Sequence, residues 1–126
     1  MKELTIEAWG EQYNVKPSLG MYKVTDFMGK ERNGLGITLD SDGEPFATLT
    51  VSFGEFIPIA NAAYIDVNNC PWATQLLSTG MATDTGLTRA SGFCRYPLWL
   101  FDAEFLRSLD EKLYDRYMAQ YKEETP

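Results

Sequence analysis

Two alternating runs of residues around an Asp-Gly pair constrain the fold of this chain more than any other feature. Residues 35–39 alternate apolar with polar or small side chains before Asp42-Gly43, and residues 47–53 alternate after it. A period of two is typical of a strand with one buried face, and Asp-Gly is a favoured two-residue hairpin turn. The sequence therefore predicts an antiparallel β-hairpin around this pair.

Further strands are expected on both sides of this hairpin. Pro17, within Lys16-Pro17-Ser18, is expected to break the chain, and Pro97 to mark an edge position or a bend. The polar segment 29–34, bounded by glycines, predicts a turn. Residues 54–61 form a connector that is rich in apolar side chains for a loop. The runs that predict the remaining strands lie at 4–8, 21–27, 62–67 and 93–101.

Two helices are expected in the C-terminal half. Pro71 suits the first position of a short helix, because its missing N–H would have no partner there, and Gly80 suits the end. Asp102 can cap a longer helix, which a polar tail at 122–126 follows. The predicted class is α+β: an antiparallel β-sheet of about five or six strands, with the short helix and the longer C-terminal helix packed on it. Its length predicts a single domain over 1–126.

Histidine is absent from all 126 residues. This excludes Ser–His–Asp and Cys–His nucleophile pairs and histidine-ligated zinc, and two cysteines cannot complete a thiolate zinc site. Asp40, Asp42 and Glu44 gather at the hairpin tip, where turn chemistry is favoured over metal binding. We therefore expect no enzyme activity, no cofactor and no metal.

The chain is acidic, with 18 acidic and 11 basic residues and a net charge of −7. This balance disfavours direct contact with nucleic acid. It suits a basic protein surface, although solubility alone also accounts for it. No apolar run approaches the ~20 residues of a membrane span, and the first ten residues alternate instead of forming a signal sequence. We expect a cytoplasmic protein with free thiols and no contact with a membrane.

The segment 62–77, which carries a single charge, contains the first candidate binding residues. Tyr64 and Asp66 share one face of the expected strand, and Asn68 adds an oxygen close by. These residues predict a ligand site or, alternatively, a turn in which Asp66 accepts backbone N–H groups.

Two arginines are candidates for binding an anion. Arg89 and Arg95 are the only bases between Arg32 and Arg107. Arg89 lies in 81–92, a segment of small, polar and glycine residues without a clear period, which predicts a mobile functional loop. The alternative is that the arginines pair with surface carboxylates.

Cys70 is a candidate nucleophile. It precedes Pro71, at the expected N-terminus of the short helix, where N–H groups favour a thiolate. No histidine is present to act as its base, and a small buried side chain is the alternative.

Tyr114, Met118 and Tyr121 form a second apolar stripe on the expected C-terminal helix, at spacings i, i+4 and i+7. Tyrosine and methionine are enriched in interfaces, so the stripe predicts contact with a partner protein or a homodimer. Burial in the core is the alternative.

Three segments carry a resemblance to a known family: residues 66–72 (DVNNCPW), 92–98 (GFCRYPL) and 43–51 (GEPFATLTV). With them the chain resembles a domain-of-unknown-function family of small proteins, typically found on conjugative transposons and related mobile elements of Gram-positive gut bacteria. The resemblance would cover nearly the whole chain. It implies a genomic setting and brings no catalytic residues.

The function expected first is a non-enzymatic protein-interaction module of a mobile element. In one version it is a counter-defence inhibitor that binds a host nucleic-acid-handling protein, because an acidic surface complements a basic groove. One alternative is a small-ligand-binding domain that uses Tyr64, Asp66, Arg89 and Arg95. The other is a thiol enzyme centred on Cys70.

Overall fold

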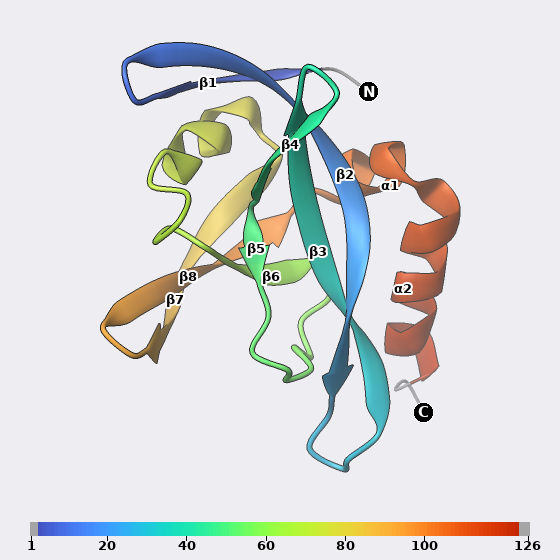
Figure 1. Ribbon diagram of the computed structural model, residues 1–126. Helices are drawn as coiled ribbons and strands as arrows, with labels where there is room; N and C mark the ends of the chain where they lie inside the picture. Colours follow the sequence, from blue (N-terminus) through green and yellow to red (C-terminus); the bar gives the residue numbers. More distant parts are fainter. Residues whose placement is uncertain (1–2, 124–126) are drawn as a thin grey trace.

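The computed structural model describes residues 3–123, and within this range eight strands form two four-stranded antiparallel sheets (Figure 1). The predicted α+β class is confirmed, with the strands divided between two sheets. The first sheet has the order β1 (Leu4–Ala8), β2 (Glu11–Thr25), β3 (Glu31–Ser41) and β4 (Glu44–Thr48). The second has the order β5 (Thr50–Val51), β6 (Ala62–Ile65), β8 (Cys94–Phe101) and β7 (Ala82–Ser91).

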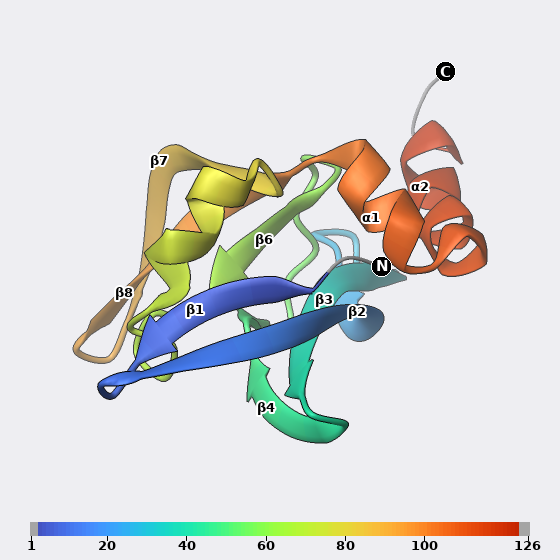
Figure 2. The same ribbon diagram turned by 90° about the horizontal axis from the view of Figure 1, so that it is seen from above.

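Three helical segments complete the fold: the 3-10 helix η1 (Ala73–Thr79), α1 (Ala103–Leu109) and α2 (Glu111–Glu123). Viewed from above, α1 and α2 lie together at one side of the sheets (Figure 2). Gly80 ends η1 in the left-handed conformation, as predicted. Lys122 lies within α2, whereas residues 124–126 of the predicted tail fall outside the described range. None of the helices in residues 3–123 is long and apolar enough to cross a membrane.

The hairpin predicted around Asp42-Gly43 is confirmed. Ser41 pairs with Glu44, so the turn has two central residues, and both adopt positive φ (53° and 79°). Two positive φ angles define the turn whose twist matches the flanking strands.

The chain passes from the first sheet to the second at Leu49. Its N–H donates to the carbonyl of Ile37 in β3 (2.9 Å), whereas its own carbonyl accepts from the N–H of Asp66 (2.9 Å). Next to it, Thr50 Oγ1 accepts the N–H of Ile37 (3.0 Å). Leu49 is itself fully buried, so one residue joins the two ladders inside the core.

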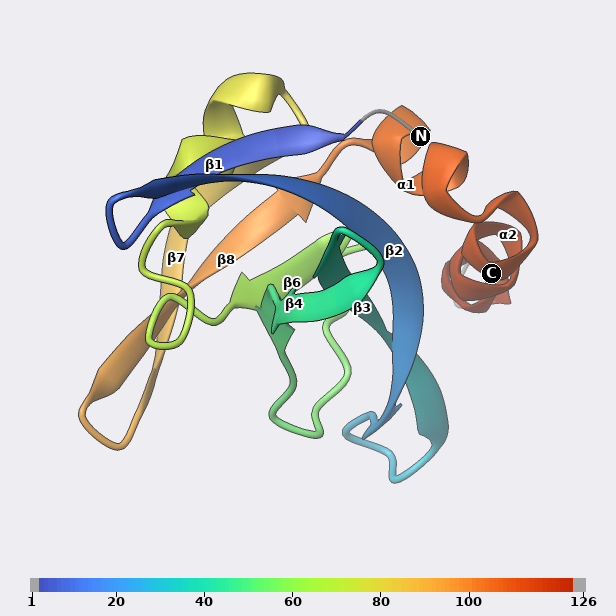
Figure 3. The same cartoon turned by 45° about the horizontal axis from the view of Figure 1, so that its top comes forward.

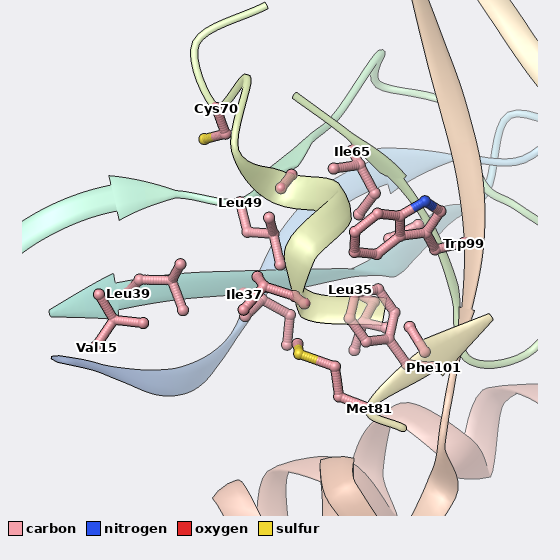
Figure 4. Close-up of a cluster of buried hydrophobic side chains, with 14 of the residues drawn as sticks. Val15, Leu35, Ile37, Leu39, Leu49, Ile65, Cys70, Met81, Trp99 and Phe101 are labelled. Carbon is pink, nitrogen blue, oxygen red and sulfur yellow. The ribbon is translucent and has the colours of Figure 1, made fainter. Parts of the chain in front are cut away.

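The core fills the space between the two sheets (Figure 4). Leu35, Ile37 and Leu39 of β3 contribute the buried side of the predicted alternation. Side chains from the second sheet and its connections meet them, namely Leu49, Ile65, Met81, Trp99 and Phe101. Burial of each such side chain stabilises the fold by roughly 1.5–3 kcal/mol.

Two glutamine side chains cover open strand edges. Gln75 of η1 accepts the N–H of Glu7 in β1 (2.8 Å) and donates to its carbonyl (2.7 Å). Gln120 of α2 accepts the N–H of Asn33 in β3 (3.0 Å) and donates to its carbonyl (2.8 Å). Backbone groups away from water need partners, and here each carboxamide takes the place of a neighbouring strand.

The expected break at Pro17 is wrong, because β2 runs through it without interruption. Pro17 pairs with Leu39, in the same alternation as Asn33 and Ile37, whose N–H groups point away from β2. The nitrogen of Pro17 therefore points away from β3. On that side β1 has already ended, at the pair of Leu4 with Val15, so no ladder bond needs the missing N–H.

The segment 81–92 is not a loop; most of it forms the edge strand β7. A register shift lies between Asp84 and Thr88, and the segment bonds to itself there. Asp84 Oδ1 accepts the N–H of Gly86 (2.9 Å), and Thr85 Oγ1 accepts the N–H of Leu87 (3.1 Å). Most of the strand is exposed, so its sequence shows no apolar period.

The expected single C-terminal helix is two helices. Asp102 caps α1 as predicted, accepting the N–H of Phe105 (2.9 Å). Asp110 adopts an extended conformation between α1 and α2 and accepts the N–H of Leu113 (3.0 Å). Asp110 therefore ends one helix and caps the next. The short helix also differs from expectation: η1 starts at Ala73, two residues after Pro71.

Replacing Gln120 with alanine tests its role as a cover for β3. We expect Gln120→Ala to lower the free energy of unfolding by about 1–3 kcal/mol, because Asn33 loses two hydrogen bonds. The measurement is urea unfolding followed by tryptophan fluorescence. Gln12→Ala is the control, because Gln12 is exposed and pairs with Glu7 of β1, outside the part of β2 that pairs with β3. Equal losses in the two variants would contradict this role.

Candidate functional site

A pocket of about 310 Å³ lies where β5 ends. Its walls come from β3, β6, β7, β8, the connector 52–59 that follows β5, and α2. Leu35, Ala63 and Leu98 form part of its apolar lining, and Phe53 and Phe56 add aromatic rings. The mixture of an apolar lining with a few polar groups is typical of small-molecule sites.

Two of the five predicted ligand residues, Tyr64 and Arg89, lie at this pocket, and Tyr121 of the predicted partner stripe lines it as well. Arg89 binds Glu55 through two hydrogen bonds of 2.6 and 3.0 Å, and its guanidinium lies 4.3 Å from the centre of the Phe53 ring. Tyr64 packs edge-on against the same ring. The hydrogen bonds from Arg89 hold the pKa of the Glu55 carboxyl below its usual value. Arg89 is therefore already paired, and the charge at this end of the pocket is balanced.

The other three predicted ligand residues lie elsewhere. Asp66 accepts the backbone N–H (3.3 Å) and the side-chain amide (2.8 Å) of Asn69, which is the turn alternative described above. Asn68 is exposed in the same turn. Arg95 is exposed on β8 and donates to Thr88 Oγ1 (2.9 Å). The five residues therefore do not form one site.

The stripe Tyr114, Met118 and Tyr121 packs inward. Tyr114 is buried and donates to Asn61 Oδ1 (2.8 Å), and Tyr121 donates to the carbonyl of Ile57 (2.8 Å). Met118 is half-buried against the core. These side chains hold α2 against the connector after β5 and do not form an exposed partner surface.

Cys70 is buried, and its thiol donates to the carbonyl of Thr48 (3.5 Å). Burial, and then the carboxylate of Asp66, raise the pKa of this thiol to about 11. Because η1 starts at Ala73, Cys70 is also not at the helix cap. These features favour a neutral packing residue over a nucleophile.

The acidic residues of the β3–β4 hairpin take no part in a metal cluster. Within residues 3–123, no group of three or more potential ligands (His, Cys, Asp or Glu) lies close enough together to hold a metal ion.

A second feature, which sequence reasoning missed, is the turn between β1 and β2. Ala8 pairs with Glu11, so Trp9 and Gly10 are the two central residues, with φ of 51° and 77°. Trp9 is 70% exposed, and its ring lies 6.3 Å from the rings of both Tyr13 and Phe46. A bulky side chain rarely adopts the left-handed conformation. The signal in the sequence is a tryptophan where a two-residue turn prefers asparagine or glycine.

The β1–β2 and β3–β4 turns both lie at the upper end of the molecule in Figure 1, and Figure 3 shows them from a second direction. Glu7 and Glu11 flank Trp9 in the sequence, and the hydroxyl of Tyr13 donates to Glu11 (2.9 Å). Residues 3–16 and 40–46 contain one lysine, Lys16, and six acids: Glu3, Glu7, Glu11, Asp40, Asp42 and Glu44. These two segments therefore carry most of the net negative charge.

Comparison with known families gives a match over most of the chain. The model of the domain of unknown function DUF4313 matches residues 21–121. The chain belongs to the DUF4313 family. Within this DUF4313 member the matched range contains every residue of the pocket and begins after the Trp9 turn. No curated protein and no solved structure matches the chain.

The burial of Cys70 predicts a difference in thiol reactivity. At a pKa of about 11, roughly one Cys70 thiol in a thousand is ionised at pH 8, whereas Cys94 is partly exposed. In native protein at pH 8 we expect iodoacetamide to label Cys94 at least ~100-fold faster than Cys70. Mass spectrometry of the Cys70→Ser and Cys94→Ser variants measures the two rates separately. Fast labelling of the Cys94→Ser variant would restore the thiol-enzyme alternative.

Proposed function

We propose that this DUF4313 protein is a non-enzymatic interaction module that binds a basic surface of a partner protein through the Trp9 turn. The observation that carries the proposal is the state of Trp9, which is exposed and held in a left-handed conformation. That conformation costs roughly 1–2 kcal/mol for a residue with a side chain. Burial of the Trp9 side chain offsets little of this cost, because most of the ring faces solvent.

A protein contact accounts for such a ring. Tryptophan is enriched among the residues that dominate binding energy, and neighbouring rings hold it in place before binding. Tyr13 and Phe46 supply this support, and Phe46 in turn packs against the buried Trp72 (5.5 Å between ring centres). The aromatic cluster is thus anchored on the core.

The surrounding carboxylates define the partner chemistry. The six acids and one lysine of residues 3–16 and 40–46 attract a surface rich in lysine and arginine and speed the encounter. Direct binding of nucleic acid is disfavoured by the same charge.

A mobile-element setting supplies a partner class. The resemblance noted in the sequence implies such a setting, where small acidic proteins often bind and block a host protein. We therefore assign the module a cytoplasmic counter-defence role, as an inhibitor of a host nucleic-acid-handling protein whose basic groove fits the acidic end. The lack of histidine and the buried thiol of Cys70 support a non-enzymatic role.

A small-ligand-binding domain is the second candidate function. It is favoured by the pocket, where Tyr64 and Arg89 meet. Asp66 and Arg95, which were expected to join them, lie outside its lining.

Replacing Trp9 with glycine separates binding from folding. We expect Trp9→Gly to change the free energy of unfolding by less than about 1 kcal/mol, because relief of backbone strain offsets the lost ring contacts. Partner affinity should fall roughly 30-fold or more. The measurements are affinity capture from a lysate of the bacterial host, followed by titration of the captured protein.

Phe93→Ala is the matched control, because Phe93 is an aromatic residue that is even more exposed than Trp9 and lies at a different turn, between β7 and β8. It should leave capture unchanged, and raising the salt to about 0.5 M should weaken capture by the wild-type protein. Recovery of no stoichiometric basic partner, together with a ligand-dependent rise in melting temperature, would overturn the proposal in favour of the second candidate.

A further inference from the structure

No hydrogen bond from a side chain, turn or loop of residues 3–123 reaches the backbone N–H or C=O of Leu35. The N–H groups of Asn33 and Ile37 both point away from β2, toward Gln120 and Thr50. In an antiparallel pair every second residue turns its N–H and C=O to the same edge, and the β2–β3 register has no irregularity here. The N–H and C=O of Leu35 therefore point to this edge as well.

The cause is the change of sheet at Leu49. Leu49 bonds to Ile37, so continued pairing along β3 would place Val51 opposite Leu35. Val51 pairs instead with Tyr64 of β6, which turns its backbone away from β3. Leu35 is thus the first residue of β3 whose outer edge the segment 49–51 does not pair with.

Ala62 of β6 is in the corresponding position on the other sheet. The residues on either side of it, Asn61 and Ala63, face β8, since the carbonyl of Asn61 accepts the N–H of Phe101 (2.8 Å). The N–H and C=O of Ala62 point to the opposite edge, where β5 has ended after Val51. No hydrogen bond reaches them from the described residues.

Both positions line the pocket described above, and both are almost fully buried (4% exposed for Leu35 and 2% for Ala62). Unpaired backbone groups at such positions are rare in native proteins. A backbone donor and acceptor on each of two strand edges therefore lie at one mainly apolar pocket.

The protein itself shows which chemical group fits such an edge. The carboxamides of Gln75 and Gln120 each bind one strand residue, accepting its N–H and donating to its C=O. Gln120 does so at Asn33, two residues before Leu35. We propose that the pocket binds an uncharged ligand with a carboxamide group, which pairs with the N–H and C=O of Leu35 in the same way.

The rest of the pocket defines the body of this ligand. Phe53, Phe56 and Leu98 offer apolar surface, and Arg89 is neutralised by Glu55. Because Arg89 and Glu55 already bind each other, neither offers a free charge to a charged ligand. A volume of about 310 Å³ suits a small apolar body that bears the carboxamide, such as one aromatic ring.

This site is independent of the Trp9 turn, and its occupant has two sources to be distinguished. The carboxamide belongs either to a free small molecule or to a glutamine side chain of a protein. Benzamide represents the first source, and the peptide acetyl-Ala-Gln-Ala-amide represents the second.

The test is titration of the ¹⁵N-labelled full chain, followed by amide shifts in ¹H–¹⁵N spectra. We expect benzamide to shift the amide of Leu35 and to bind at least ~10-fold more tightly than N,N-dimethylbenzamide, which lacks the donor. Benzoate is charged and also lacks the donor, so it should bind no more tightly than N,N-dimethylbenzamide. Tighter binding of the peptide than of benzamide would assign the site to a protein side chain and retain the proposed pairing.

Two variants of exposed residues control for folding. Leu87 lines the pocket, whereas Phe93 lies outside it in the turn that follows the same strand. Leu87→Ala should weaken benzamide binding about threefold or more, and Phe93→Ala should not change it. The proposal is overturned if neither probe shifts the Leu35 amide, or if benzamide and its dimethyl analogue bind equally.

Discussion

The backbone of Leu49 is the connection on which the rest of the structure depends. Its N–H bonds to the first sheet and its carbonyl to the second. One buried residue therefore joins the two sheets at the core that lies between them. Thr50 supports the change of direction by accepting the N–H of Ile37 through its side chain. The same change leaves Leu35 uncovered. The joint that closes the core thus also creates the pocket.

The elements that alternation predicts are the ones with a single buried face. The β3–β4 hairpin follows this rule, and Asp42-Gly43 supplies the turn it needs. Elements without such a face escaped prediction: β7 is exposed along most of its length, so its strand character has no apolar signal. Pro17 was misread for a different reason. Its effect depends on which edge its nitrogen faces, and that is a property of the register between strands.

The candidate site was predictable only in part. Tyr64 and Arg89 were found from their residue types, and pairing between β5, β6, β7 and β8 brings them to one pocket. Leu35 and Ala62 could not be found in this way, because their contribution is backbone rather than side chain. The apolar residues of 54–61 were a visible signal, since a surface loop has little reason to carry so many. Trp9 was not predicted as a site residue, because its exposure and its left-handed backbone become visible only in the structure of its turn.

The register shift in β7 has a consequence for behaviour at high concentration. β7 is an edge of the second sheet, and a long exposed edge invites pairing with another copy of the chain. Here Asp84 and Thr85 occupy the N–H groups of Gly86 and Leu87, in the middle of that edge. An incoming strand would find no continuous row of donors. The bulge therefore protects this acidic protein against edge-to-edge aggregation without the cover of a helix.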